Sequence, residues 1–226
     1  MNILAVDTAL GACSAALVAD GRVLAHRHRE MLRGHAEDLA PMVQNVMREA
    51  GMEFSALDRM GVTTGPGTFT GQRVGLAFAR ALGLALKRPV IGVTTLEAMA
   101  EEALTRAPDA AWALVAADAK RGEIYLGARS AKGENLLAPE LIPLNEIAAR
   151  IGQFPHRFGR AVVLAGTAAE AAIPLLAGAG LQPMDSLVRQ PDAIFVAKLA
   201  AHAPEGPPPK PLYLRAPDAK LPGAAP

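Results

Sequence analysis

The residues best suited to bind a ligand form a glycine-rich stretch, GPGTFTG, at positions 65–71. It follows an apolar run typical of a strand and precedes a helical pattern over residues 71–87. Gly67 can adopt positive φ without steric cost, and Thr68 or Thr70 can cap the helix. Such a turn presents backbone N–H groups at the positive end of a helix, which attracts phosphate or carboxylate groups. The alternative is a tight connector that binds no ligand.

Asp7, in the first turn of the chain, is the second candidate for ligand binding. Proteins of the actin, Hsp70 and sugar-kinase class approach a nucleotide's phosphates there through an acidic residue and a nearby glycine, and Asp7, Thr8 and Gly11 resemble that arrangement. Asp7, Gly67 and Thr68 are therefore the predicted phosphate contacts. The glycine-rich stretch is not a Walker A loop, because no lysine follows its glycines at the required place. The alternative for Asp7 is a hydrogen bond within its own turn.

The histidines lack the spacing of a metal site. His35 stands just before a helical pattern, and a helical site such as HExxH needs a second histidine four residues later, where this chain has Leu39. The other histidines, at positions 26, 28, 156 and 202, form no convincing ligand spacing. We therefore expect neither a metal ion nor a catalytic residue.

Composition limits the class of protein. The chain has 226 residues, 51% of them apolar, which suits one large domain or two modest ones. Its single cysteine, Cys13, excludes an internal disulfide. The N-terminus has no basic leader and the longest apolar segment, residues 74–86, is too short to span a bilayer, so we expect a cytoplasmic protein without membrane contact. The net charge of +1 gives no global attraction for nucleic acid.

Alternation and helical periodicity predict an α/β chain in which strands followed by helices occur twice. Strands are expected at residues 2–6, 13–19, 23–29, 59–64, 90–93, 112–117, 124–128, 135–142 and 162–165, and helices at about 36–50, 71–87, 95–103, 168–176 and 194–201. The predicted domains are an N-terminal lobe, residues 1–106, completed by a helix at about 191–203, and a smaller second lobe, residues 107–190. Residues 204–226 form an extended, proline-rich tail, whose PLYLR stretch could dock on the body or on a partner.

The helix over residues 71–87 carries a strip of small residues, Gly75, Ala79 and Gly83, spaced four apart. Each glycine inside a helix costs about 1 kcal/mol relative to alanine, so close approach of another helix is expected to compensate. That helix could belong to this chain or to a partner subunit. Because the helix is apolar nearly all round, we favour a partner.

Five stretches together resemble one family: ILAVDTALGACSAAL, GPGTFTGQRVGLAFARALGLAL, IGVTTLEAMA, DAKRGEIYLG and PLYLR. In this order and at these distances they resemble the TsaB (YeaZ) family, bacterial partner proteins in threonylcarbamoyladenosine synthesis on tRNA. The resemblance covers nearly the whole chain except about residues 129–189. It implies a two-lobed α/β fold of the actin and Hsp70 (ASKHA) class with a reduced second lobe.

The resemblance also implies a non-catalytic role. The related catalytic subunit, TsaD, holds a metal through histidines on the helix equivalent to the one after His35, and it transfers threonylcarbamoyl from its adenylate to N6 of adenosine 37 in ANN-decoding tRNAs. Family members of the present kind have lost that site, and Leu39 agrees with the loss. They bind and activate TsaD, a small ATPase, TsaE, joins them, and they form homodimers when TsaD is absent. Contact with tRNA is then expected mainly through the complex.

Docking in this family uses the first two helices, which form a helical bundle with the partner. The interface residues implied for this chain are Leu39, Met42 and Val46 on the first helix and Gly75, Leu76, Ala79, Gly83 and Leu86 on the second. The small-residue strip falls on this surface. No intrinsic cofactor is expected, and ATP or ADP at the partner interface stays open.

Two other functions stay open as well. An enzyme active on its own, either an ATP-binding phosphotransferase or a metal-dependent hydrolase, has support only from Asp7, the glycine-rich stretch and Asp118. Direct tRNA binding could use a local run of arginines at positions 22, 27, 29 and 33. Aromatic residues for base stacking make up only 4% of the chain, and a solvated strand edge explains the arginines equally well.

Overall fold

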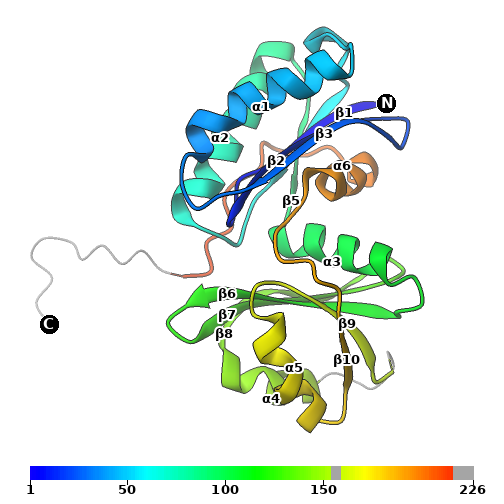
Figure 1. Ribbon diagram of the computed structural model, residues 1–226. Helices are drawn as coiled ribbons and strands as arrows, with labels where there is room; N and C mark the ends of the chain where they lie inside the picture. The colour runs from blue at the N-terminus through cyan, green and yellow to red at the C-terminus, as the bar shows by residue number, and fades with distance from the viewer. Residues whose placement is uncertain (154–158, 216–226) are drawn as a thin grey trace, which may run out of the picture.

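The chain folds into two lobes, each built on a five-stranded mixed sheet (Figure 1). The structure is a computed structural model that describes residues 1–153 and 159–215. The first sheet has the strand order β3-β2-β1-β4-β5 and the second has the order β10-β9-β6-β7-β8. Since β6, β7, β8, β9 and β10 correspond in turn to β1, β2, β3, β4 and β5, both lobes have the same topology.

The first sheet forms from a meander and two parallel strands. Its strands are β1 (Asn2–Asp7), β2 (Ala12–Ala19), β3 (Arg22–Glu30), β4 (Arg59–Thr63) and β5 (Val90–Val93). β1, β2 and β3 pair antiparallel, whereas β4 lies parallel to both β1 and β5. The meander turns at Asp20 and Gly21, whose φ angles of 48° and 78° are those expected of a tight hairpin turn. The carboxyl ends of β1 and β4 therefore lie side by side at one edge of the lobe.

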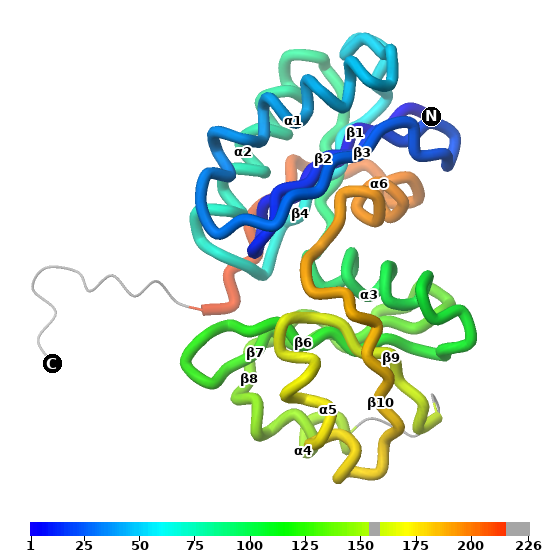
Figure 2. Tube along the Cα trace, viewed as in Figure 1, coloured from blue at the N-terminus to red at the C-terminus, as the bar shows by residue number. Residues whose placement is uncertain are grey.

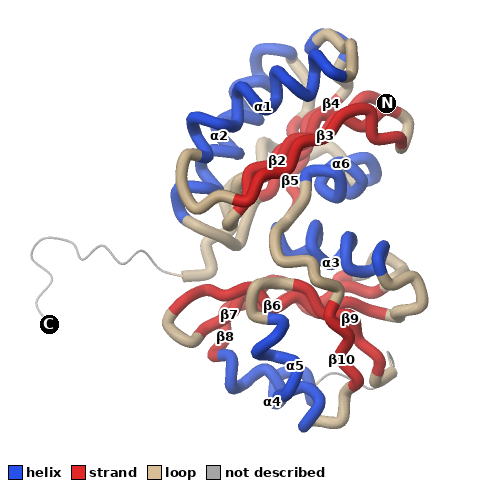
Figure 3. Tube along the Cα trace, in the orientation of Figure 1, coloured by secondary structure: helices blue, strands red, loops and turns tan. Residues whose placement is uncertain are grey.

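Two helices cover the outer face of the first sheet, and one covers the inner face (Figure 3). The outer helices, α1 (His35–Glu49) and α2 (Phe69–Leu86), pack on β2 and β4, and the short turn η1 (Phe54–Ala56) precedes β4. The inner helix α6 (Ala193–His202) packs on β1, β2 and β4, although the whole second lobe separates it from them in sequence. Apolar residues alternate along β1 and β2, so each face of the sheet has its own core.

The second lobe repeats this arrangement at a smaller size. Its strands are β6 (Trp112–Lys120), β7 (Glu123–Ser130), β8 (Asn135–Pro143), β9 (Ala161–Ala165) and β10 (Gln182–Asp185). The turn η2 (Leu144–Glu146) and the helices α4 (Ile147–Gly152) and α5 (Ala169–Gly178) lie on its outer side, with apolar residues of α4 and α5 in one core with β6, β7 and β9. The strand β10 and the helix α4 carry no clear periodic pattern, and the sequence did not predict them.

The helix α3 (Thr95–Arg106) lies between the two sheets (Figure 1). Thr94 caps it, because its hydroxyl accepts from the amide of Glu97 while the Glu97 carboxylate accepts from the amide of Thr94. It falls inside the segment predicted as the N-terminal lobe, but most of its buried face packs on β6, β7 and β9. α3 also contacts α6, so these two helices form the layer shared by the lobes.

None of the helices in the described part of the chain is long and apolar enough to cross a membrane. The tail leaves α6, and the described part of it ends at residue 215, so the predicted extension over residues 216–226 lies outside the described residues.

The strip of small residues on α2 faces the chain's own sheet. Gly75, Ala79 and Gly83 are all buried. A Cβ atom built on Gly75 would lie 2.7 Å from Thr8 Oγ1, and one built on Gly83 would lie 2.4 Å from Val90 Cγ2. The prediction that this strip receives a partner helix is therefore wrong. The missing side chains bring α2 close to β4 and β5, because a sheet rather than a helix fills the groove.

We predict that Gly83→Leu lowers the free energy of unfolding of the isolated protein by about 1–3 kcal/mol, because the added side chain overpacks a closed contact. Urea unfolding followed by circular dichroism measures this change. Ala77→Leu is the matched control, since Ala77 lies on the exposed side of the same helix and should change stability by no more than about 0.5 kcal/mol. Equal stability of the two variants would contradict this packing.

Candidate functional site

The glycine-rich loop is clamped to the first turn of the chain. The amide of Thr68 donates to the carbonyl of Ala9 at 2.8 Å, and the hydroxyl of Thr8 donates to the carbonyl of Gly71 at 2.7 Å. A Cβ on Gly67 would lie 2.3 Å from the Ala9 carbonyl oxygen. Glycine is therefore needed at position 67 because the backbone of the loop lies so close to the backbone of Ala9. The expected positive φ is instead found at Gly65, at 104°.

Thr68 caps α2, as one of the two predicted alternatives. Its hydroxyl accepts a hydrogen bond from the amide of Gly71 at 3.1 Å. The amides of Thr68 and Gly71 thus have partners inside the chain, so the loop presents fewer bare donors than the sequence suggested. Gln72 is buried behind the loop against Gly65, and its Oε1 has no hydrogen-bond partner among the described residues. Phosphate binding at Gly67 and Thr68 remains a prediction.

Asp7 is fully buried at the carboxyl end of β1. Its Oδ1 accepts from the Thr63 hydroxyl at 2.6 Å and from the Ala9 amide at 3.1 Å, whereas its Oδ2 has no hydrogen-bond partner among the described residues. Burial raises the pKa of Asp7 to about 7, against the lowering effect of the Thr63 and Ala9 hydrogen bonds. The bond from the Ala9 amide is the hydrogen bond within its own turn that the alternative interpretation of Asp7 predicted. Thr63 completes the group, and no feature of the sequence singled it out.

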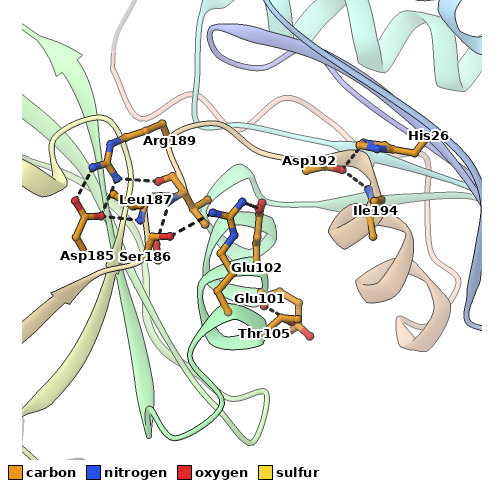
Figure 4. Close-up of polar contacts among 12 residues, drawn as sticks. His26, Glu101, Glu102, Thr105, Asp185, Ser186, Leu187, Arg189, Asp192 and Ile194 are labelled. Carbon is orange, nitrogen blue, oxygen red and sulfur yellow. Dashed lines mark hydrogen bonds and ion pairs between the residues drawn. The ribbon is translucent and has the colours of Figure 1, made fainter.

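Segment 186–192 carries the chain back from the second lobe to the first, and polar contacts hold it on both sides (Figure 4). On the second-lobe side, the Arg189 guanidinium donates to both carboxylate oxygens of Asp185, at 2.8 and 2.5 Å. On the first-lobe side, the side chain of Gln190 accepts from the amide of Gly11 at 2.8 Å. The first turn of the chain is therefore fixed by the glycine-rich loop and by this crossing segment together.

Two carboxylates lie in or beside the same segment, the partly buried Asp192 and the buried Glu102. Asp192 caps α6 by accepting from the Ile194 amide at 2.8 Å, and its Oδ1 lies 3.0 Å from His26 Nε2 (Figure 4). Burial opposes the charge of Asp192, but the contacts with His26 and the Ile194 amide prevail and lower its pKa. Glu102 of α3 pairs with Arg106 at 2.5 Å, yet burial still raises its pKa. These groups anchor the crossing between the lobes.

The turns after β6 and β9 in the second lobe hold Asp118. The amide of Asp118 donates to the Thr167 hydroxyl at 2.8 Å, and its carboxylate pairs with Lys120, which lowers the pKa of Asp118. A Cβ on Gly166 would lie 2.0 Å from the Ala116 carbonyl oxygen, so the glycine allows the turn after β9 to press on β6. Asp118 is thus held in place by Lys120 of its own turn and by Thr167.

The predicted partner-interface residues lie mainly inside the protein. Leu39, Met42 and Val46 of α1 and Leu76 of α2 belong to the core between these helices and the sheet, and Leu86 is half-buried beside it. The assignments of Leu39, Met42, Val46 and Leu76 to a docking surface are wrong, because the chain itself covers these side chains, whereas that of Leu86 stays a prediction. The side of α2 that faces solvent carries other residues, namely Arg73, Ala77, Arg80, Ala81, Leu84 and Ala85.

Other candidate groups have ordinary structural contacts. Within residues 1–153 and 159–215, no three His, Cys, Asp or Glu side chains lie close enough to hold a metal ion, and His156 falls outside these ranges. Two arginines of the basic run pair with carboxylates of α1, Arg27 with Glu49 and Arg29 with Asp38, each at 2.5 Å. Burial raises the pKa of Cys13 to about 12, which fits an inert core thiol.

We predict that Asp7 makes the protein less stable as pH rises from about 4 to about 7. Its pKa moves from 3.8 in the unfolded chain to about 7 in the fold, so in this window folding keeps a proton that the unfolded chain loses. The expected slope is about 1.4 kcal/mol per pH unit for this one group. Asp7→Asn removes this titrating carboxyl. The difference in unfolding free energy between variant and parent should therefore grow between pH 4 and 7 and then level off. A constant difference across urea titrations at pH 4 to 8 would contradict the assignment.

Comparison with known proteins identifies the relationship. The family model described as "TsaD: tRNA N6-adenosine threonylcarbamoyltransferase" matches residues 27–171. The tRNA threonylcarbamoyladenosine biosynthesis protein TsaB of Escherichia coli (strain K12) is 42% identical over 125 residues, which are 55% of this chain and 53% of that protein. This match spans about half the length of the curated relative. An uncharacterized protein of Mycobacterium tuberculosis (strain ATCC 25618 / H37Rv) is 36% identical over 222 residues, covering 97% of this chain and 94% of the relative.

Solved structures show the same relationship and the fold class. A Pseudomonas aeruginosa protein described as similar to peptidase YeaZ is 32% identical, with a TM-score of 0.79 over 95% of this chain and 99% of that one. The ROK hexokinase of Thermus thermophilus has a TM-score of 0.52 at 17% identity, over 89% of this chain and 98% of that chain, and shows the fold alone. The expected actin-like α/β fold is therefore confirmed, and the chain belongs to the TsaB (YeaZ) family.

Proposed function

We propose that this protein is a non-catalytic subunit in the synthesis of threonylcarbamoyladenosine on tRNA. It binds and activates a homologous TsaD-like catalytic subunit, which transfers the threonylcarbamoyl group to N6 of adenosine 37 in ANN-decoding tRNAs. The observation that carries this proposal is the family relationship, because it extends over nearly the whole chain and includes curated members named for this biosynthesis.

The contacts of the candidate acidic residues support an accessory role. Each of these carboxylates has a structural partner for at least one oxygen: Asp7 Oδ1 with Thr63, Asp118 with Lys120, and Asp192 with His26. The helix α1, which begins at His35, has buried Leu39 where a second histidine would have to stand. A metal-dependent hydrolase needs a set of ligands that the described residues do not assemble.

The outer face of α1 and α2 is the proposed docking surface for the catalytic subunit. The two helices contact each other and lie side by side over the first sheet (Figure 3). On α2, Ala77, Ala81 and Leu84 face solvent, and Leu84 is 82% exposed. Small side chains next to an exposed leucine let a partner helix approach closely while burying apolar surface. This face lies on the other side of α2 from the buried glycine strip.

The remaining parts of the proposal follow from the same assembly. In the absence of the catalytic subunit, two copies of this chain associate through the same face. A TsaE-like ATPase joins the complex, tRNA is contacted mainly through the complex in the cytoplasm, and ATP or ADP binds at the interface rather than to this subunit alone. The glycine-rich loop begins α2, so its phosphate-binding potential lies at the edge of the proposed interface.

We predict that Leu84→Asp abolishes complex formation with the TsaD-like subunit, because it places a charge in the centre of an apolar contact. Size-exclusion chromatography of the mixed subunits measures assembly, and an assay of threonylcarbamoyladenosine formation with and without this chain measures activation. The isolated variant should keep the circular dichroism of the parent, since Leu84 packs on little else.

Met184→Asp is the matched control, because Met184 is 52% exposed on β10, in the other lobe. It should assemble and activate like the parent. Normal assembly of Leu84→Asp would refute this docking surface. Turnover of substrate by this chain alone would instead refute the non-catalytic role and favour an independent phosphotransferase or hydrolase.

A further inference from the structure

The C-terminal tail runs from α6 past the first sheet toward the second lobe (Figure 2). Arg59 holds its start by donating to the carbonyls of Ala200 and Ala203, at 2.9 and 3.0 Å. Pro209 then lies against Gly92, where a Cβ would be 2.7 Å from the proline Cβ. Because the neighbours of Gly92 along β5 face α6, Gly92 itself points to the opposite face of the sheet. The tail has therefore passed from one face to the other.

The tail next binds the first lobe beside the glycine-rich loop. The amide of Leu212 donates to the carbonyl of Thr64 at 2.7 Å. The ring of Tyr213 stacks on Phe69, with centroids 5.5 Å apart, and its hydroxyl accepts from Arg73 Nε at 2.8 Å. The guanidinium of Arg73 also lies 3.5 Å from the centre of the Phe69 ring. One backbone bond and one aromatic stack thus seat the tail on the first turns of α2.

Two residues later the tail binds the second lobe. The guanidinium of Arg215 donates to the carbonyl of Ala119 at 2.9 Å and to the carboxylate of Glu123. These two acceptors lie on either side of the turn between β6 and β7. The side chains of this ion pair are partly open to solvent, with exposed fractions of 26% for Arg215 and 33% for Glu123. Residues 212–215 therefore connect the two lobes through noncovalent contacts, in addition to the chain segments that join the lobes.

We propose that residues 212–215 form a releasable strap that holds the second lobe against the first at the glycine-rich loop. The covalent path from α3 enters β6 at Trp112, whereas the strap holds the end of β6 at Ala119, roughly 23 Å away along the strand. The strap thus acts far from this entry point, at the end of β6 where the crossing segment 186–192 and Leu10 also join the lobes. Partly exposed ion pairs and stacks are individually weak, so the strap can open without unfolding either lobe.

The distance between the lobes in the full-length protein tests this proposal. Nitroxide labels at Arg22→Cys on β3 and Asn145→Cys after β8 report it by pulsed electron paramagnetic resonance, and both positions are exposed. Cys13 is fully buried and stays unlabelled. We expect one short distance in the parent, with a longer population of a few per cent or less. Arg215→Ala and Tyr213→Ala should each raise the longer population to at least about a third of the molecules.

Lys210→Ala is the matched control, since Lys210 is an exposed tail residue outside the strap. It should keep the distance distribution of the parent. Tyr213→Phe keeps the stack but loses the Arg73 hydrogen bond, so an intermediate distribution is expected even if the alanine variants fold poorly. A single unchanged distance in Arg215→Ala, Tyr213→Ala and Tyr213→Phe would overturn the proposal. No partner subunit is needed, and dilution of the labelled protein with unlabelled protein removes distances between copies, so this outcome is independent of the proposed function.

Discussion

The close approach of α2 to the first sheet is the constraint on which the arrangement of this protein depends. Two glycines and an alanine remove the side chains that would separate helix from strands, and β4 and β5 fill the space. This packing fixes the start of α2 against the first turn of the chain, where Thr8 donates to Gly71 and Ala9 accepts from Thr68. The glycine-rich loop, the buried carboxyl of Asp7 and the seat of the tail all derive their positions from it.

The sequence predicted the architecture well because the relevant signals are local. Alternating apolar residues marked the strands, and the GPGTFTG stretch marked a strand-to-helix turn. The two-lobed fold followed from a resemblance that runs through most of the chain. The strand β10 and the helix α4 escaped prediction because each is short and neither has a clear period.

The direction of the small-residue strip could not be predicted, because periodicity shows which residues share a helix face but not what covers that face. The sequence of α2 is apolar on both sides, so either side could have been the buried one. Only the register of α2 over Met60 and Val90 shows that the glycines belong to the interior. Thr63 and Gln190 could not be predicted as site residues for a similar reason, since their contacts join residues far apart in sequence.

The path of the tail around β5 also affects the solubility of the protein. An uncovered edge strand offers unpaired backbone groups to other chains and so promotes aggregation. Here Pro209 lies against Gly92 of β5, after Pro207 and Pro208 in the sequence, and proline has no N–H group with which to extend a sheet. A second molecule that approached this edge would meet prolines instead of a template for strand pairing, so the tail protects the monomer from edge-to-edge association.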